Sequence, residues 1–168
     1  MEDERTDLFL SHDWGKNHKN HEKVKTINEA LRKLGYVTWI DEERLKNDIR
    51  AEMAQGILNS KCFIAFITKN YHDKVVYGPD HDNCKGEFNF ASITTPIVPV
   101  ILEESMRNTC DWKGNVGFTL ATKLYIDISG DVNDTKYLAT KVEALTEILK
   151  SRKIFPSADD NRIGNDGE

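Results

Sequence analysis

The sequence predicts an α/β fold in which an open, parallel, five-stranded sheet carries helices on both faces. Short runs of β-branched and aromatic residues alternate with stretches in which apolar residues recur every three or four positions. The first run, 7–11, holds three consecutive apolar residues, as a strand covered on both faces does. Strands that alternate with helices pair in parallel through right-handed crossovers, so we expect a layered α/β domain.

The expected elements follow one another along the chain. The strands are 7–11, 36–40, 62–68, 97–102 and the weaker 124–128. Apolar residues at helical spacing mark the helices: Val24, Ile27, Leu31 and Leu34, ended by Gly35; Ile49, Met53, Ile57 and Leu58; the segment 84–93; and Leu138, Val142, Leu145 and Leu149. Gly78, Pro79 and several aspartates predict an exposed, mobile connection over 71–83. Pro99 predicts an edge or irregular pairing for the fourth strand, since proline cannot donate to a ladder.

Composition excludes several classes of protein. The 168 residues are 39% apolar with a net charge of -5, which fits one water-soluble domain and no nucleic-acid partner. The three cysteines lack zinc or redox spacing, so we expect reduced thiols and a cytoplasmic location. No run reaches the roughly 18 to 20 apolar residues that a membrane span needs. The segment 156–168 is polar and without period, which predicts a disordered tail.

The predicted sheet also predicts where a ligand binds. In open α/β sheets, ligands sit beyond the carboxyl ends of the strands, where the strand order reverses. With the order 2-1-3-4-5, this place lies between the first and third strands. The side chains expected around it are Ser11, His12, Asp13 and Trp14 after the first strand, Trp39 at the end of the second, and the helix that begins near Cys84 as the far wall.

Four segments of the chain, 7–12 (DLFLSH), 35–41 (GYVTWID), 57–64 (ILNSKCFI) and 97–101 (IVPVI), occur in a distinctive order and spacing. Together they resemble the sequence boxes of a Toll/interleukin-1 receptor (TIR) domain over residues 6–150. The resemblance implies a flavodoxin-like sheet of order 2-1-3-4-5. It also implies that the loop 41–48, with Asp41, Leu45 and Asp48, mediates association with other TIR domains into a homo-oligomer or filament.

The resemblance extends to an activity. Enzymatic TIR domains cleave NAD⁺ between nicotinamide and ribose, in immune or cell-death signalling, with a glutamate on the helix after the third strand. The segment 83–88 (NCKGEF) matches that motif at Cys84 and Glu87, whereas Asn83 stands where many enzymatic members have tryptophan. The resemblance therefore implies that Glu87 is catalytic and that NAD⁺ is the substrate, with no cofactor and no metal. The product would be ADP-ribose or a cyclic isomer.

One carboxylate is enough for this chemistry, although most glycosidases need two. Nicotinamide leaves as a neutral base, so no general acid has to protonate it. A fixed anion beside the sugar stabilises the positive charge that develops at the anomeric carbon in the transition state. Trp39, or Trp14, would supply an aromatic face on which a ring of the substrate stacks.

Each candidate residue has a simpler interpretation. The simpler interpretation of Glu87 is a solvated charge near a helix N-terminus, and that of Trp39 is a core residue. His12 would only hydrogen bond at the rim of the site. His18 and His21 lack further ligands for a metal site. The cluster of Lys16, Lys19, Lys23 and Lys25 is typical of a solvated face, although Lys16 or Lys19 would suit a pyrophosphate.

Three classes of function follow from this fold: an NAD⁺ hydrolase or cyclase, a non-catalytic adaptor that signals through TIR–TIR association, and a phosphoacceptor of the response-regulator kind. The third is excluded because the third strand ends at Thr68 and Lys69, where the phosphorylated aspartate should stand. An adaptor has no need of an acid at position 87, so Glu87 favours the enzyme.

Overall fold

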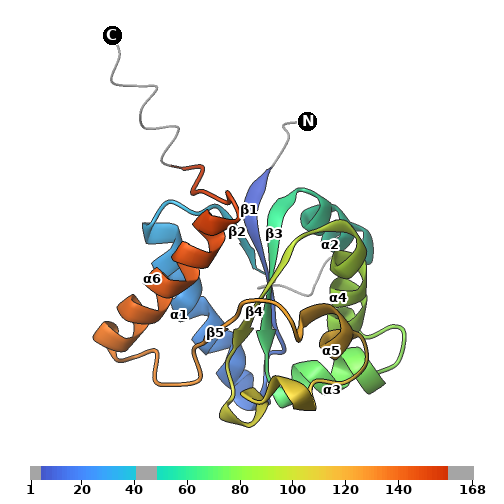
Figure 1. Ribbon diagram of the computed structural model, residues 1–168. Coiled ribbons are helices and arrows are strands. Elements are labelled where there is room, and N and C mark those ends of the chain that lie inside the picture. Colours follow the sequence, from blue (N-terminus) through green and yellow to red (C-terminus); the bar gives the residue numbers. More distant parts are fainter. Residues whose placement is uncertain (1–4, 41–48, 159–168) are drawn as a thin grey trace.

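The computed structural model describes residues 5–40 and 49–158. Within them, five parallel strands form a single sheet of order β2-β1-β3-β4-β5 (Figure 1). The strands are β1 (Thr6–Ser11), β2 (Thr38–Ile40), β3 (Ser60–Ile67), β4 (Ile97–Ile101) and β5 (Ile126–Asp127). The predicted fold class and strand order are confirmed.

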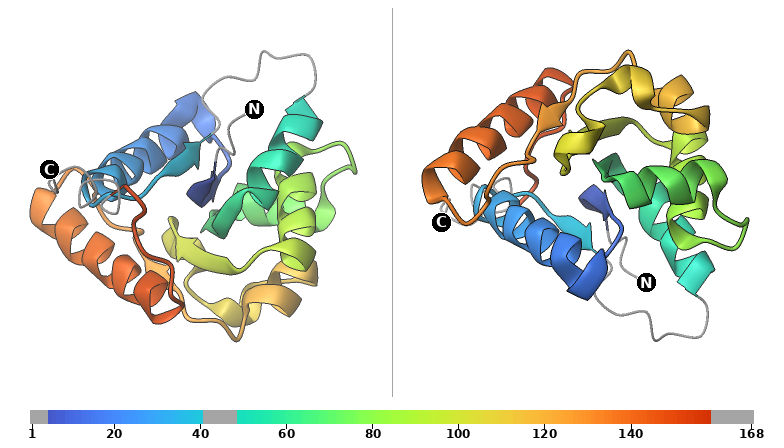
Figure 2. Two further views of the ribbon diagram at one scale, coloured as in Figure 1. Left: turned by 90° about the horizontal axis from the view of Figure 1, so that it is seen from above. Right: turned by 90° about the horizontal axis from the view of Figure 1, so that it is seen from below.

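Helices cover both faces of the sheet. They are α1 (Lys19–Lys33), α2 (Ile49–Leu58), α3 (Lys69–Tyr77), α4 (Asn83–Thr94), α5 (Gly114–Leu120) and α6 (Thr135–Ser151), with short 3-10 turns η1 (Lys16–His18), η2 (Glu104–Met106) and η3 (Thr109–Asp111). The two end views show α1 and α6 on one side of the strands and α2 to α5 on the other (Figure 2). The chain is therefore a three-layer sandwich.

The central strands separate two apolar cores because their side chains alternate between the faces. In β1, Leu8 and Leu10 pack with α1 and α6, whereas Phe9 points to the opposite core with Phe63 of β3. All four side chains are at most 1% exposed. This double burial explains the consecutive apolar residues that predicted the strand.

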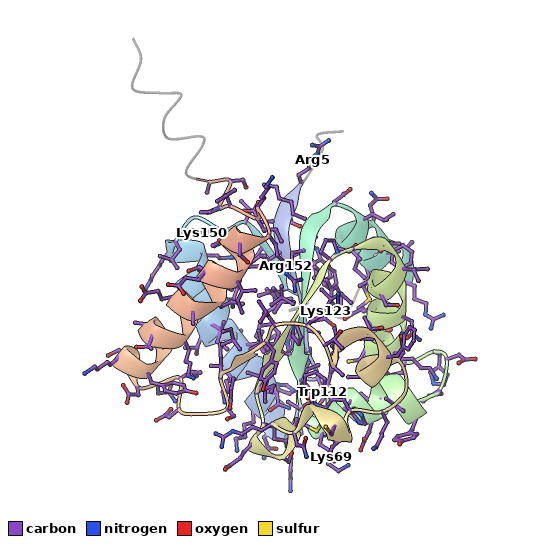
Figure 3. The ribbon with its side chains drawn as sticks, viewed as in Figure 1. Arg5, Lys69, Trp112, Lys123, Lys150 and Arg152 are labelled. Carbon is purple, nitrogen blue, oxygen red and sulfur yellow. The ribbon has the colours of Figure 1, made fainter. Side chains whose placement is uncertain are left out.

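All strands run in the same direction, so their carboxyl ends share one edge of the sheet. Arg5, just before β1, lies at one end of the molecule, and Lys69, which follows β3 and begins α3, lies toward the other end (Figure 3). The loops that build the candidate site leave from this carboxyl edge.

The segment 71–83 is only in part the exposed connection that we expected, because its first half is helical. Residues 69–77 form α3, and the Thr68 side chain caps this helix by accepting a hydrogen bond from the Tyr71 backbone N–H at 3.1 Å. Tyr71 and Val75 lie one turn apart and are buried. The turn residues Gly78 and Pro79 come only after the helix has ended, which is why composition alone gave the wrong prediction.

Pro99 does not mark an edge strand, because β4 pairs with β3 and with β5. Leu102 donates its backbone N–H to Ile67 at 3.0 Å, so alternate residues of β4 direct their N–H toward β3. The Pro99 nitrogen therefore faces β5, and β5 begins to pair only at Val100. The ladder loses no hydrogen bond at the proline.

A buried carboxylate holds the amino end of the sheet together. Asp7 is 0% exposed, and its Oδ2 accepts hydrogen bonds from the Val37 N–H at 2.8 Å and from the Ser157 N–H and hydroxyl, each at 3.0 Å. Its Oδ1 lies 3.0 Å from Lys61 Nζ. Ser157 belongs to the predicted disordered tail, 156–168, of which residues after 158 lie outside the described region. Asp7 thus joins β1 to β2, β3 and the end of the domain.

We predict that Asp7→Ala lowers the free energy of unfolding by about 3 kcal/mol, because three hydrogen bonds to a buried charged group are lost. Urea titration at pH 7 measures the loss. Glu147→Gln, a matched change of an exposed carboxylate on α6, should alter stability by less than about 0.5 kcal/mol. Equal stability of the two variants would contradict this role for Asp7.

Candidate functional site

Glu87 lies in the second turn of α4, which begins where the Asp82 side chain accepts a hydrogen bond from the Lys85 N–H at 3.0 Å. The residue is only 8% exposed, so it is not a solvated surface glutamate. It nevertheless lines a cavity of about 300 Å³ between α2 and α4. A buried carboxylate on a cavity wall is typical of a functional site.

The cavity is mainly apolar, with charged groups around it. Its walls come from α2, from the turn before α4 and from α4 itself, through Arg50, Met53, Ala54, Ile57, Asp80, Asp82, Asn83, Gly86, Glu87 and Phe90. Arg50 is exposed and donates to the Asp80 carbonyl at 2.8 Å. Asn83 occupies the wall position at which the resemblance led us to look for tryptophan.

Ser11 and Tyr71 hold the Glu87 carboxylate from the side of the sheet. The Ser11 hydroxyl at the end of β1 donates to Glu87 Oε2 at 2.6 Å, and its oxygen lies 2.9 Å from the Tyr71 hydroxyl. Burial, the largest cause, raises the pKa of Tyr71 well above its ordinary value, so its hydroxyl remains protonated near neutral pH.

Cys84 ties α4 to the same end of β1. Its thiol is 3% exposed and donates to the His12 carbonyl at 3.7 Å. Burial raises the pKa of this thiol, so it stays protonated as the donor. Cys84 is not among the described residues that line the cavity, and its expected part in substrate binding stays a prediction.

His12 and Trp14 turn toward α1 rather than toward the cavity. The His12 Nε2 and His21 Nδ1 atoms lie 2.8 Å apart, and the Trp14 ring stacks on His21 with a centroid distance of 4.0 Å. Among the described residues, no group of three or more histidine, cysteine or acidic side chains is arranged to hold a metal ion. The structure therefore places these predicted site residues in a separate aromatic cluster.

Asp13 forms an ion pair with α3. Its Oδ1 lies 2.6 Å from Lys74 Nζ, and its Oδ2 accepts from the Gly15 N–H at 3.1 Å. Partial burial lowers the pKa of Lys74, but the hydrogen bond and the charge of Asp13 outweigh this effect, so the net pKa lies above the ordinary value. The pair fixes the loop after β1 against α3.

Trp39 has one ring face in the core and is half-buried. It stacks on Phe9 with a centroid distance of 4.5 Å and an interplanar angle of 13°. On the α2 side, a Cβ atom built at Gly56 would lie 3.6 Å from the Trp39 ring. One face of the Trp39 ring therefore packs in the core, as the simpler interpretation expected. Its stacking on a ligand stays a prediction.

Of the predicted site residues, the structure brings Glu87 to the cavity wall and Ser11 into contact with it. The association loop, including Asp41, Leu45 and Asp48, lies outside the described residues. The sequence analysis did not identify Tyr71, because we expected its segment to be exposed. The cap at Thr68 followed by Tyr71 and Val75 at helical spacing is the signal that could have revealed it.

Comparison with known families agrees with this architecture. The family model described as TIR domain matches residues 8–145. The chain belongs to the TIR domain family. No curated protein matched the sequence. No helix within 5–40 or 49–158 is long and apolar enough to cross a bilayer.

Two solved structures share the TIR fold. The TIR domains of the activated Roq1 resistosome, which recognises the pathogen effector XopQ, align with a TM-score of 0.58 at 19% identity, over 83% of this chain and 99% of that one. A metazoan TIR-STING receptor from C. gigas, in complex with 2',3'-cGAMP, aligns with a TM-score of 0.57 at 13% identity, over 84% of this chain and 40% of the receptor. These similarities establish the fold of the TIR domain.

The Asp13–Lys74 pair yields a test of how the β1 loop is held. We predict that Lys74→Met lowers the free energy of unfolding by about 2 to 4 kcal/mol, because Asp13 is buried and would lose its cation. Thermal and urea unfolding measure this loss. Lys69→Met is the matched control on the same helix: its partner Asp73 is exposed, so the loss should stay below about 1 kcal/mol. Similar losses in both variants would contradict the prediction.

Proposed function

We propose that this TIR domain is an NAD⁺ nucleosidase that cleaves the bond between nicotinamide and ribose, with Glu87 as the catalytic carboxylate. The observation that carries the proposal is the buried Glu87 side chain, which lines a cavity and is held by Ser11. A scaffold that acts only by association needs no oriented carboxylate in a cavity. This difference favours the enzyme over the adaptor.

The geometry suits a reaction with one charged group. As the bond to nicotinamide breaks, positive charge develops on the ribose, and an anion fixed in a partly dehydrated site stabilises this charge more than it stabilises the ground state. Ser11 keeps the carboxylate oriented before the substrate arrives. The nicotinamide leaves as a neutral molecule, so the site requires no second carboxylic acid, metal or cofactor.

The cavity matches part of the substrate. A volume of about 300 Å³ is at the small end of ligand sites, so it would take the nicotinamide riboside portion, and the remainder would extend toward the surface. The Arg50 guanidinium, exposed on the wall, would pair with the diphosphate. Water would then capture the ribose cation and give linear ADP-ribose. Capture by another atom of the same ADP-ribose unit would give a cyclic product.

Glu87→Gln tests the proposal directly, because it keeps the size of the side chain and removes its charge. We expect release of nicotinamide from NAD⁺ to fall by about a hundredfold or more, with the melting temperature nearly unchanged. Glu52→Gln, on the exposed side of α2, is the matched control and should retain full activity. A folded Glu87→Gln protein with wild-type turnover would overturn the assignment, and absence of activity in the wild type would favour the adaptor.

We further propose that activity depends on assembly through the loop 41–48. This segment places charges of both signs around one apolar side chain, Leu45, and such a composition suits a weak, salt-sensitive contact. The Roq1 TIR domains belong to a resistosome, which supports association between TIR domains here. A contact between different surfaces of two copies would give a head-to-tail oligomer.

Turnover per molecule should therefore rise with protein concentration and fall with added salt. Leu45→Asp should abolish the concentration dependence and most of the activity while leaving the melting transition in place. Leu124→Asp changes an exposed leucine elsewhere and serves as the control. Constant turnover over a hundredfold range of concentration, in a sample that light scattering finds monomeric, would contradict the assembly proposal.

A further inference from the structure

Tyr71 is the largest of the fully buried side chains that contact the site. It lies in the first turn of α3, is 0% exposed, and packs edge-to-face with Phe88 of α4 at a centroid distance of 6.4 Å. Its hydroxyl nevertheless reaches the end of β1, where it lies 2.9 Å from Ser11 Oγ. A phenylalanine would make the same ring contacts, so the core does not explain the hydroxyl.

The direction of the hydrogen bonds is fixed by the chemistry of the groups. Ser11 has one hydroxyl hydrogen and donates it to Glu87 Oε2 at 2.6 Å. The Ser11 oxygen can then only accept from Tyr71, which therefore donates. The result is an ordered chain of two hydrogen bonds that runs from Tyr71 through Ser11 to Glu87.

We propose that Tyr71 is a positioning residue that acts through Ser11 to orient the Glu87 carboxylate and keep it ionised, an inference that rests on the proposed function of Glu87. Three elements meet in this chain: α3 supplies Tyr71, β1 supplies Ser11 and α4 supplies Glu87. A side chain of α4 is attached one residue further along, because the Cys84 thiol donates to the carbonyl of His12. Both the helix and its carboxylate are thus fixed relative to the end of β1.

The chain of hydrogen bonds from Tyr71 to Glu87 matters for catalysis because a buried carboxylate is costly to ionise without donors. A hydrogen bond that a hydroxyl donates to the charged form favours that form. Donation from Tyr71 polarises the Ser11 hydroxyl and strengthens its bond to Glu87, as expected for linked hydrogen bonds in a site of low dielectric constant. Since burial raises the pKa of Tyr71, the phenol remains the donor over the pH range of an assay.

Tyr71→Phe removes only the hydroxyl. We expect kcat to fall about three- to tenfold, as for loss of one buried hydrogen bond, with KM unchanged because Tyr71 touches no cavity surface. The acid limb of the kcat profile should move to higher pH, since the Ser11 hydrogen bond that favours the ionised form of Glu87 is weakened. Tyr36→Phe is the matched control: the Tyr36 hydroxyl donates to Ile154 at 3.2 Å, away from the site, so its loss should lower stability and leave kcat and the pH profile unchanged.

A double-mutant cycle tests whether Tyr71 acts through Ser11. Ser11→Ala already removes both hydrogen bonds between Tyr71 and Glu87, so adding Tyr71→Phe should lower kcat by less than about twofold further. Full additivity of the two kcat losses would overturn the inference. So would a Tyr71→Phe protein with the kcat and acid limb of the wild type.

A measurement without NAD⁺ separates this inference from the proposed function. In protein labelled with ¹³C at the glutamate carboxyl groups, the signal missing from Glu87→Gln reports the titration of Glu87. Its half-protonation should occur at higher pH in Tyr71→Phe and at the wild-type pH in Tyr36→Phe. A shifted titration in a protein that releases no nicotinamide would refute the reaction and retain the link, whereas an unshifted titration in an active enzyme would refute the link alone.

Discussion

The position of β1 is the constraint on which the rest of the structure depends. This strand pairs with β2 on one side and β3 on the other, and its side chains enter both apolar cores. At its carboxyl end, Ser11 contacts Glu87 on one face of the sheet, and His12, the next residue, contacts His21 of α1 on the other. A strand with so many neighbours has only one register that satisfies them all, so the groups at its end are held with little freedom.

The polar groups at the two ends of β1 have different roles, one structural and one at the candidate site. At the amino end, Asp7 is surrounded by donors from the residue before β2, from β3 and from the segment after α6, and its role is to close the sandwich. At the carboxyl end, Ser11 contacts a carboxylate that also faces a cavity. Both carboxylates are buried, yet only Glu87 borders space that a ligand can enter. Burial alone therefore does not identify a catalytic group, and the cavity makes the distinction.

The parts of the fold that could be predicted are those marked by residues close together in the sequence. Strand β1 is a run of consecutive apolar residues and helices α1 and α6 carry strong helical periodicity, and the crossover rule then determines the parallel sheet. Helix α3 was missed because its apolar residues are few and turn-forming residues follow it closely. Pro99 shows the same limit, since the choice between an edge strand and an irregular pairing depends on where β5 begins to pair, which the local sequence does not contain.

The site was predictable only in part. Glu87 was identified through the resemblance of its segment to a family motif, not through any property of its own environment. The contact of Ser11 with Glu87 joins residues 76 positions apart, and that with Tyr71 joins residues 60 apart. Such contacts arise from packing of α3 and α4 on the sheet. The packing of His12 and Trp14 against α1 depends instead on ring stacking with His21, a contact between residues near in sequence that apolar periodicity does not reveal.

The bonds between Asp7 and Ser157 have a practical consequence for protein engineering. They bring positions 150 residues apart in the sequence side by side, at the edge of the sheet opposite the cavity. A short peptide joining these two points would close the backbone into a ring, and new ends could then be opened in a surface turn. The same geometry makes this edge a suitable place to attach a fluorophore or a solid support, because the attachment would leave the mouth of the cavity unobstructed.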